Sequence, residues 1–198
     1  MRVHLLLATL LVATVAFAQT IPAPTDAYQI RYAANLAVGE SFINITNAGS
    51  VNGFEPAGNI CANVYVFDAD QQLVACCTCP LTPNHLKTLG VRADLTSNTL
   101  TPGVPASATI ALLATTGTCN AATVTADRLV AGMRAWGTTI HALPTGGYGV
   151  GETEFSSAPL SATQLQKLTT YCGFIQANGS GYGICRSCRQ GAQGGTRR

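Results

Sequence analysis

The sequence has few charged side chains and few of the residues that usually perform catalysis. Only 10% of its 198 residues are Asp, Glu, Lys or Arg, and its formal net charge is +2. Nucleic acids and anionic membrane surfaces bind clustered Lys and Arg side chains, so this composition argues against both as partners. His85 and His141 adjoin no recognisable catalytic motif, and the chain lacks a G-x-S-x-G elbow. We therefore predict no catalytic residue and no cofactor, and keep a hydrolase that uses either histidine beside a carboxylate as the enzymatic alternative.

The chain also lacks an apolar run of the roughly 18 residues needed to cross a bilayer. Its longest apolar run, residues 5–17, follows Arg2 and ends near the small residues Ala16 and Ala18. This pattern is typical of a cleaved signal peptide. We expect residues 1–18 to be removed on export to the periplasm, the cell surface or the medium, which leaves no membrane span.

Residues 19–188 are expected to form one domain, because a chain of this length most simply builds one core. The last residues, 189–198, contain little to bury and are expected to be disordered.

All eight cysteines lie beyond the expected cleavage site. An even number of cysteines in an exported chain favours disulfides, although the sequence leaves their connectivity open. The disulfide candidates are Cys61, Cys76, Cys77, Cys79, Cys119, Cys172, Cys185 and Cys188.

The stretch CANVYVFDADQQLVACCTCP, residues 61–80, contains half of these cysteines. Its β-branched and aromatic run at residues 64–67 is typical of a strand with a half-buried surface. The short polar residues Asp68 and Asp70 follow, and a second apolar run returns at 73–77. This order predicts an antiparallel hairpin, with its second strand ending at Pro80.

The hairpin register predicts a disulfide partner for Cys61. A turn centred on residue 69 places Cys61 opposite Cys77, and a turn centred on residue 70 places it opposite Cys79. Directly paired residues have the Cβ separation that a disulfide needs, so we predict that Cys61 bonds Cys77 or Cys79. Cys76 and Cys77 must point to opposite faces of the sheet, because side chains alternate along a strand.

Further alternating or apolar segments predict strands at residues 29–36, 40–46, 86–96, 108–115 and 128–143, the last continuous or broken at Gly137. Gly, Pro and Asn residues separate them, and residues 143–157 are expected to be a loop. Short strands with such turns predict a mostly β fold, an antiparallel β-sandwich of immunoglobulin-like or jelly-roll-like type, stabilised by disulfides.

One C-terminal α-helix is expected at about residues 162–178. Ser161 and Gln164 have the spacing of a capping box, and an apolar face repeats through Leu168 and Cys172. Since a short glycine-rich spacer follows the helix, we predict that Cys172 pairs with Cys185 or Cys188.

Two segments resemble a group of uncharacterised exported bacterial proteins. Its members share a YVFD-x-x-QQL-x-x-CC-x-CP segment and a FIQ-x-NGSG-x-GIC-x-x-C segment, which match residues 65–80 and 174–188 here. The resemblance covers under a quarter of the chain. It implies export and links the two cysteine clusters, and it implies no activity.

Three sets of side chains have an alternative chemical interpretation. Cys76, Cys79, Cys185 and Cys188 are candidate thiolate ligands for a metal such as zinc. Asp68 and Asp70 are candidate calcium ligands, although turn formation is the simpler interpretation. Glu152 and Glu154 are a candidate carboxylate pair for glycoside chemistry or simply solvated acids.

We therefore predict a secreted or cell-surface structural or interaction module, and not an enzyme. Its partner is an unknown protein or surface, with self-association as the alternative. The alternative is a metal- or thiol-dependent extracellular protein that uses the two cysteine clusters.

Overall fold

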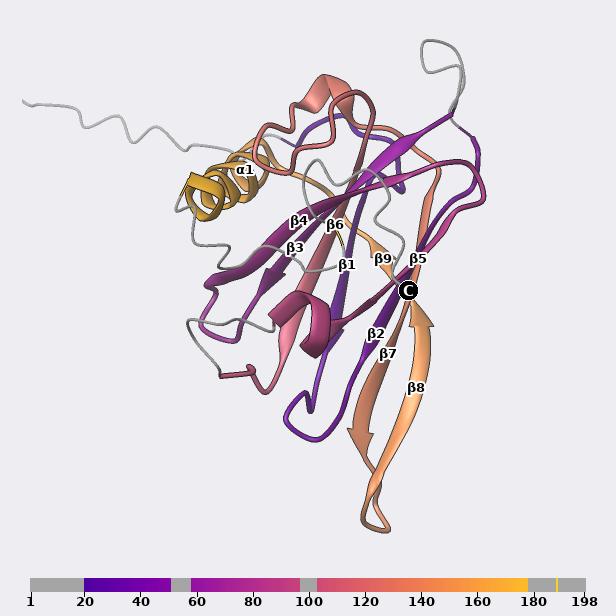
Figure 1. Ribbon diagram of the computed structural model, residues 1–198, viewed down its shortest axis with the longest axis vertical. Helices are drawn as coiled ribbons and strands as arrows, with labels where there is room; N and C mark the ends of the chain where they lie inside the picture. Colours follow the sequence, from indigo (N-terminus) through magenta and orange to yellow (C-terminus); the bar gives the residue numbers. More distant parts are fainter. Residues whose placement is uncertain (1–19, 51–57, 97–102, 178–187, 189–198) are drawn as a thin grey trace, which may run out of the picture.

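The computed structural model describes residues 20–50, 58–96, 103–177 and 188 (Figure 1). The expected signal peptide and the expected disordered tail lie outside these residues. The described strands are β1 (Tyr28–Ala33), β2 (Phe42–Asn47), β3 (Ile60–Phe67), β4 (Leu73–Leu81), β5 (Leu86–Gly90), β6 (Ala108–Thr115), β7 (Met133–Ala142), β8 (Tyr148–Glu154) and β9 (Ser156–Ser157), and they precede one helix, α1 (Ala162–Ala177).

The strands form two antiparallel sheets, which confirms the predicted β-sandwich. The five-stranded sheet has the order β4-β3-β6-β1-β9, and the four-stranded sheet has the order β5-β2-β7-β8. Their facing sides share one core, to which Val64 and Leu112 contribute from the first sheet and Ile45 and Leu89 from the second. The predicted alternation of β2 is confirmed, because Ile45 is buried and its neighbours Asn44 and Thr46 are only partly covered.

Helix α1 covers the other face of the five-stranded sheet (Figure 1). Leu168 and Cys172 of α1 belong to a second core with Tyr65 of β3 and Leu113 of β6. Strand β3 is therefore buried on both faces, with only Phe67 partly exposed, and the predicted half-buried surface is wrong. Continuous apolar runs such as β3 and β6 are the expected sequence for strands covered on both sides.

The β3–β4 hairpin forms as predicted, but neither predicted register is correct. Cys61 lies opposite Pro80, because a bulge shifts the ladder between Val66 and Phe67. The turn is also longer than expected: the carboxylate of Asp68 accepts hydrogen bonds from the backbone N–H groups of Asp70 at 3.0 Å and Gln72 at 2.8 Å. One extra residue on one strand changes every pairing beyond it. No cysteine of β4 therefore lies opposite Cys61, and β4 continues past Pro80 to Leu81.

The predicted strand at residues 86–96 is correct only in its first half. Strand β5 ends at Gly90, and a π-helical turn, Val91–Thr96, follows. The Glu40 carboxylate accepts hydrogen bonds from the backbone N–H groups of Arg92 and Ala93 at 2.7 and 3.0 Å. Side chains that bind the backbone in this way compete with a sheet ladder, which explains why the strand stops.

The predicted loop at residues 143–157 contains β8 and β9. Only a short turn remains, closed by the N–H of Leu143 donating to the carbonyl of Gly147 at 3.1 Å. Gly146 and Gly147 have φ angles of 87° and 83°, which side-chain-bearing residues rarely adopt. Strand β8 has no apolar alternation because it is a mostly exposed edge strand, so its sequence resembles that of a loop.

Helix α1 confirms the capping prediction. The backbone N–H of Gln164 donates to Ser161 Oγ at 3.0 Å, which satisfies one of the free donors of the first turn. The described helix ends at Ala177, one residue before the predicted end.

Candidate functional site

Cysteine bridges connect three parts of the chain to β3 and β4. Cys76 of β4 bonds Cys172 of α1, with the Cα atoms 5.7 Å apart. The predicted pairing of Cys172 with Cys185 or Cys188 is therefore wrong. The buried face of α1 that carries Cys172 lies on the outer face of β4, so the sheet and not the tail supplies the partner.

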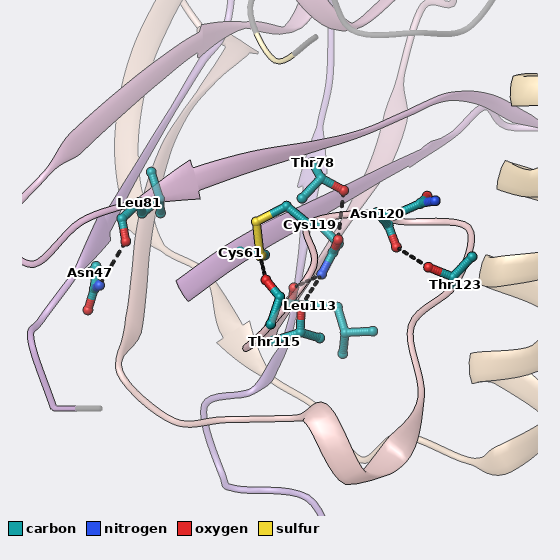
Figure 2. The surroundings of a disulfide bond; sticks show 11 residues. Asn47, Cys61, Thr78, Leu81, Leu113, Thr115, Cys119, Asn120 and Thr123 are labelled. Carbon is teal, nitrogen blue, oxygen red and sulfur yellow. Dashed lines mark hydrogen bonds between the residues drawn. A yellow bond between two sulfur atoms is a disulfide. The ribbon is translucent and has the colours of Figure 1, made fainter. Parts of the chain in front are cut away.

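Cys61 bonds Cys119 in the loop after β6, with the Cα atoms 5.3 Å apart (Figure 2). The predicted partners Cys77 and Cys79 are wrong for a second reason besides the register. Both belong to the core between the sheets, as do Ala62 and Val64 of β3, whereas Cys61 alternates with these residues and therefore points to the helix-covered face. Cys76 belongs to the helix-covered core, as the predicted opposition of Cys76 and Cys77 requires.

A buried polar network lies beside the Cys61–Cys119 bridge. The side-chain amide of Asn63 donates to the carbonyl of Leu113 and to Thr115 Oγ1, both at 2.9 Å. Its oxygen accepts from Thr78 Oγ1 at 2.8 Å. Thr78 and Thr115 lie near the bridge in Figure 2. Because its partners satisfy both ends of the amide, this fully buried residue stabilises one strand register.

The third bridge brings sulfur atoms together inside the sandwich. Cys79 of β4 bonds Cys188, and Cys77 is also disulfide-bonded. The sulfur atoms of Cys77, Cys79 and Cys188 all lie within 4.8 Å of one another, and all three residues are buried. In this oxidised state the cluster is structural. After reduction, three thiolates at this spacing would be suitable ligands for a thiophilic metal.

The structure corrects the predicted metal set. Cys76 lies on the opposite face of β4 from Cys79 and is bonded to α1, so it cannot join Cys79 and Cys188 at one ion. Cys77 takes its place in the cluster. Cys185 lies outside the described residues.

The other predicted candidates are separated in the fold. His85 lies in the turn before β5, whereas His141 lies near the end of β7, opposite Gly149. The pairing of Leu86 with Thr46 and of Thr46 with Arg134 puts His85 near the other end of β7. The two histidines are therefore separated by roughly 20 Å of strand. Within the described residues, neither histidine is in an ion pair with a carboxylate.

The acidic candidates have structural partners. Asp68 holds the β3–β4 turn through its two backbone hydrogen bonds, as the turn interpretation predicts. Glu152 and Glu154 lie on exposed β8, where Glu154 forms an ion pair with Arg134 of β7. Burial lowers the pKa of the Arg31 guanidinium, and the negative charge of Glu152 opposes part of this effect.

Sequence reasoning missed Arg31, a nearly buried cation at the junction of the sheets. Only 8% of this β1 residue is exposed, and burial lowers the pKa of its guanidinium. The guanidinium lies 5.8 Å from the centre of the Phe155 ring. It also packs against Gly137 of β7, where an added Cβ would approach Arg31 Nε to 2.6 Å. A glycine inside a strand often marks such a close approach, so Gly137 was the available signal.

No protein family, curated protein or solved structure matches this chain. Within the part of the chain that the structure describes, no helix has the length and hydrophobicity of a membrane span.

Proposed function

We propose that this chain is an exported, non-enzymatic interaction module whose disulfides fix a rigid β-sandwich. The observation that supports this most directly is the placement of the bridges. The three bridges between described residues join β3 or β4 to other segments, at sequence separations of 58, 96 and 109 residues. Disulfides of this kind persist in oxidising compartments outside the cytosol. The signal-peptide pattern at residues 1–18 and the resemblance to exported bacterial proteins support the same compartment.

The binding surface in this proposal belongs to the four-stranded sheet. Strand β8 is an edge strand, and Val150 and Tyr148 expose 66% and 51% of their surfaces. The β7–β8 hairpin extends beyond the rest of the sandwich (Figure 1). Exposed edges and projecting aromatic residues are typical sites of protein recognition.

A metal- or thiol-dependent function is the second candidate, and the grouping of Cys77, Cys79 and Cys188 is the observation that favours it. Intact mass of the protein purified from an oxidising compartment separates the two candidates. The sample is alkylated without reductant, and a parallel sample is measured under native conditions to detect bound metal.

We expect no alkylation and no metal increment, because every described cysteine is disulfide-bonded. Reduction before alkylation is the positive control. Alkylation of the unreduced protein at Cys77, Cys79 or Cys188, or a mass increment matching zinc, would instead support the metal- or thiol-dependent function.

A further inference from the structure

We propose that a groove along the open edge of β1 binds a carboxylate group, with Arg31 as its cationic partner. The groove has a volume of about 450 Å³. Arg31 and Tyr32 of β1, Thr139 of β7 and Thr153 of β8 line it. It lies where the chain leaves the four-stranded sheet after β8 and joins the five-stranded sheet as β9.

Arg31 brings a positive charge to this groove without a carboxylate in contact. Its Nη1 donates to the carbonyl of Thr153 at 2.6 Å and also to Thr153 Oγ1, and its Nη2 donates to Thr139 Oγ1 at 2.9 Å. Its Nε is buried and has no acceptor. The ion pair present in the described residues joins other side chains, Arg134 and Glu154. Glu152 acts on Arg31 through its charge but forms no ion pair with it in the described residues. Buried charges are normally paired in direct contact, so an anion in the groove would supply the contact that Arg31 lacks.

The backbone of β1 adds a second donor. The N–H of Ala114 donates to the carbonyl of Ala27, and the N–H of Ala158 donates to the carbonyl of Tyr28. Antiparallel pairing alternates, so even-numbered residues of β1 direct their N–H and C=O groups away from β6. Strand β9 covers this edge only opposite Gln29 and Ile30. The N–H of Tyr32 therefore faces the groove, and its carbonyl accepts from Thr139 Oγ1 at 3.2 Å.

The other lining groups favour a singly charged acid. The Thr139, Thr153 and Ser156 hydroxyls are neutral and can donate or accept hydrogen bonds. Glu154 also lines the groove, but its charge is offset by Arg134. The charge of Glu152, which has no ion-pair partner among the described residues, also acts on Arg31. Because this negative charge would repel a doubly charged phosphate more strongly than a singly charged acid, the groove is better suited to a carboxylate. Arg guanidinium groups are also well matched to carboxylate geometry.

Two ligands share this chemistry. One is a small organic acid. The other is the C-terminus of an extended peptide that pairs with β1 beyond the end of β9. The side chains of such a peptide would lie beside Tyr32 and Ile30, which are 59% and 37% exposed.

This inference rests on the proposed binding role and specifies a site for it. The mass experiment reports on cysteines and the experiment below on β1, so either proposal can fail while the other stands.

The test is an NMR titration of the ¹⁵N-labelled, disulfide-intact protein with three probes. They are sodium acetate, an acetylated Thr-Val-Thr peptide with a free carboxylate, and the same peptide as its C-terminal amide. We expect both acids to shift the Arg31 Nε–H and Tyr32 N–H resonances saturably, with an affinity on the order of 1 mM or tighter. The amide should shift neither. Tighter binding of the peptide acid identifies a peptide C-terminus as the ligand, and equal binding identifies a small acid.

Two variants and a charge-matched control accompany the titration. Arg31→Gln should weaken acid binding at least about tenfold, and Arg31→Lys, which keeps the charge but loses the planar fork, should weaken it less. Arg92→Gln removes the same charge from the turn after β5 and should leave binding unchanged. Unshifted Arg31 and Tyr32 resonances in the wild-type protein, or equal responses to acid and amide, would overturn the proposal even if an Arg31 variant fails to fold.

Discussion

The two sheets of this protein differ in how they are covered and cross-linked. The five-stranded sheet lies between α1 and the other sheet, and all three described bridges attach to its strands β3 and β4. The strands of the four-stranded sheet contain no cysteine, and β8 at its edge is largely exposed. The difference indicates that the five-stranded sheet contributes more to stability, and in the function proposed above the four-stranded sheet supplies the binding surface.

The groove at β1 lies where these two regions meet. Its cation, Arg31, belongs to the five-stranded sheet. The hydroxyl groups that orient the guanidinium belong to Thr139 and Thr153 of the four-stranded sheet. A site built in this way holds its charged group on a rigid strand, which favours a preorganised geometry.

Removing the bridge between β4 and α1 should have the largest effect on stability. The double variant Cys76→Ala/Cys172→Ala opens a bridge that spans 96 residues. We expect the free energy of unfolding to fall by about 4–5 kcal/mol, mainly because the unfolded chain gains freedom. Urea unfolding followed by circular dichroism measures the change. An unchanged midpoint would show that the bridge does not contribute to the stability of the five-stranded sheet.

A matched pair of valines compares the sheets directly. Val64 of β3 is fully buried, whereas Val150 of β8 is 66% exposed. Val64→Ala should destabilise the fold by roughly 2–3 kcal/mol, through lost burial and the cavity that remains. Val150→Ala should change it by less than about 0.5 kcal/mol. The same urea experiment measures both, and equal effects would contradict the assignment of stability to the five-stranded sheet.

The local features of the fold could be predicted from the sequence. Strand β6 was predicted with its observed bounds, and Ser161 caps α1 as its spacing indicates. These features depend on neighbouring residues. The β3–β4 register was not predicted because a bulge beside Val66 leaves no mark in the sequence pattern and yet shifts every residue pair beyond it. Strand β8 was not predicted because an exposed edge strand needs no apolar pattern.

The site could not be predicted because it depends on contacts between distant segments. Both specific disulfide predictions assumed that cysteines pair with partners close along the hairpin or the tail, whereas Cys61 and Cys172 bond partners on other elements. Arg31 is one charged residue in a short strand. Its role follows only from Gly137, Thr139 and Thr153, which are more than one hundred residues away in the sequence and meet it across the sheet junction.

Two tyrosines extend the comparison to polar groups. Tyr65 of β3 is fully buried and its hydroxyl donates to the carbonyl of Ala121 at 2.7 Å, whereas Tyr148 of β8 is 51% exposed. Removing a buried hydrogen bond leaves the Ala121 carbonyl without this partner. We expect Tyr65→Phe to cost about 1–2 kcal/mol and Tyr148→Phe to change stability by less than about 0.5 kcal/mol.

The pH dependence of Tyr65→Phe provides the sharper measurement. Burial, with a smaller contribution from Tyr28, raises the pKa of Tyr65 well above its ordinary value. The folded state therefore holds this proton more tightly than the unfolded state. The resulting stability is complete below the unfolded value of about 10 and decreases as pH rises above it, by up to about 1.4 kcal/mol per pH unit. Urea unfolding at several pH values between about 8 and 11 measures this dependence. The free energy of unfolding should fall less steeply with rising pH in Tyr65→Phe than in the wild-type protein. Parallel declines would mean that the Tyr65 hydroxyl ionises as readily in the folded chain as in the unfolded one, and that the helix-covered face of the sheet is accessible to water.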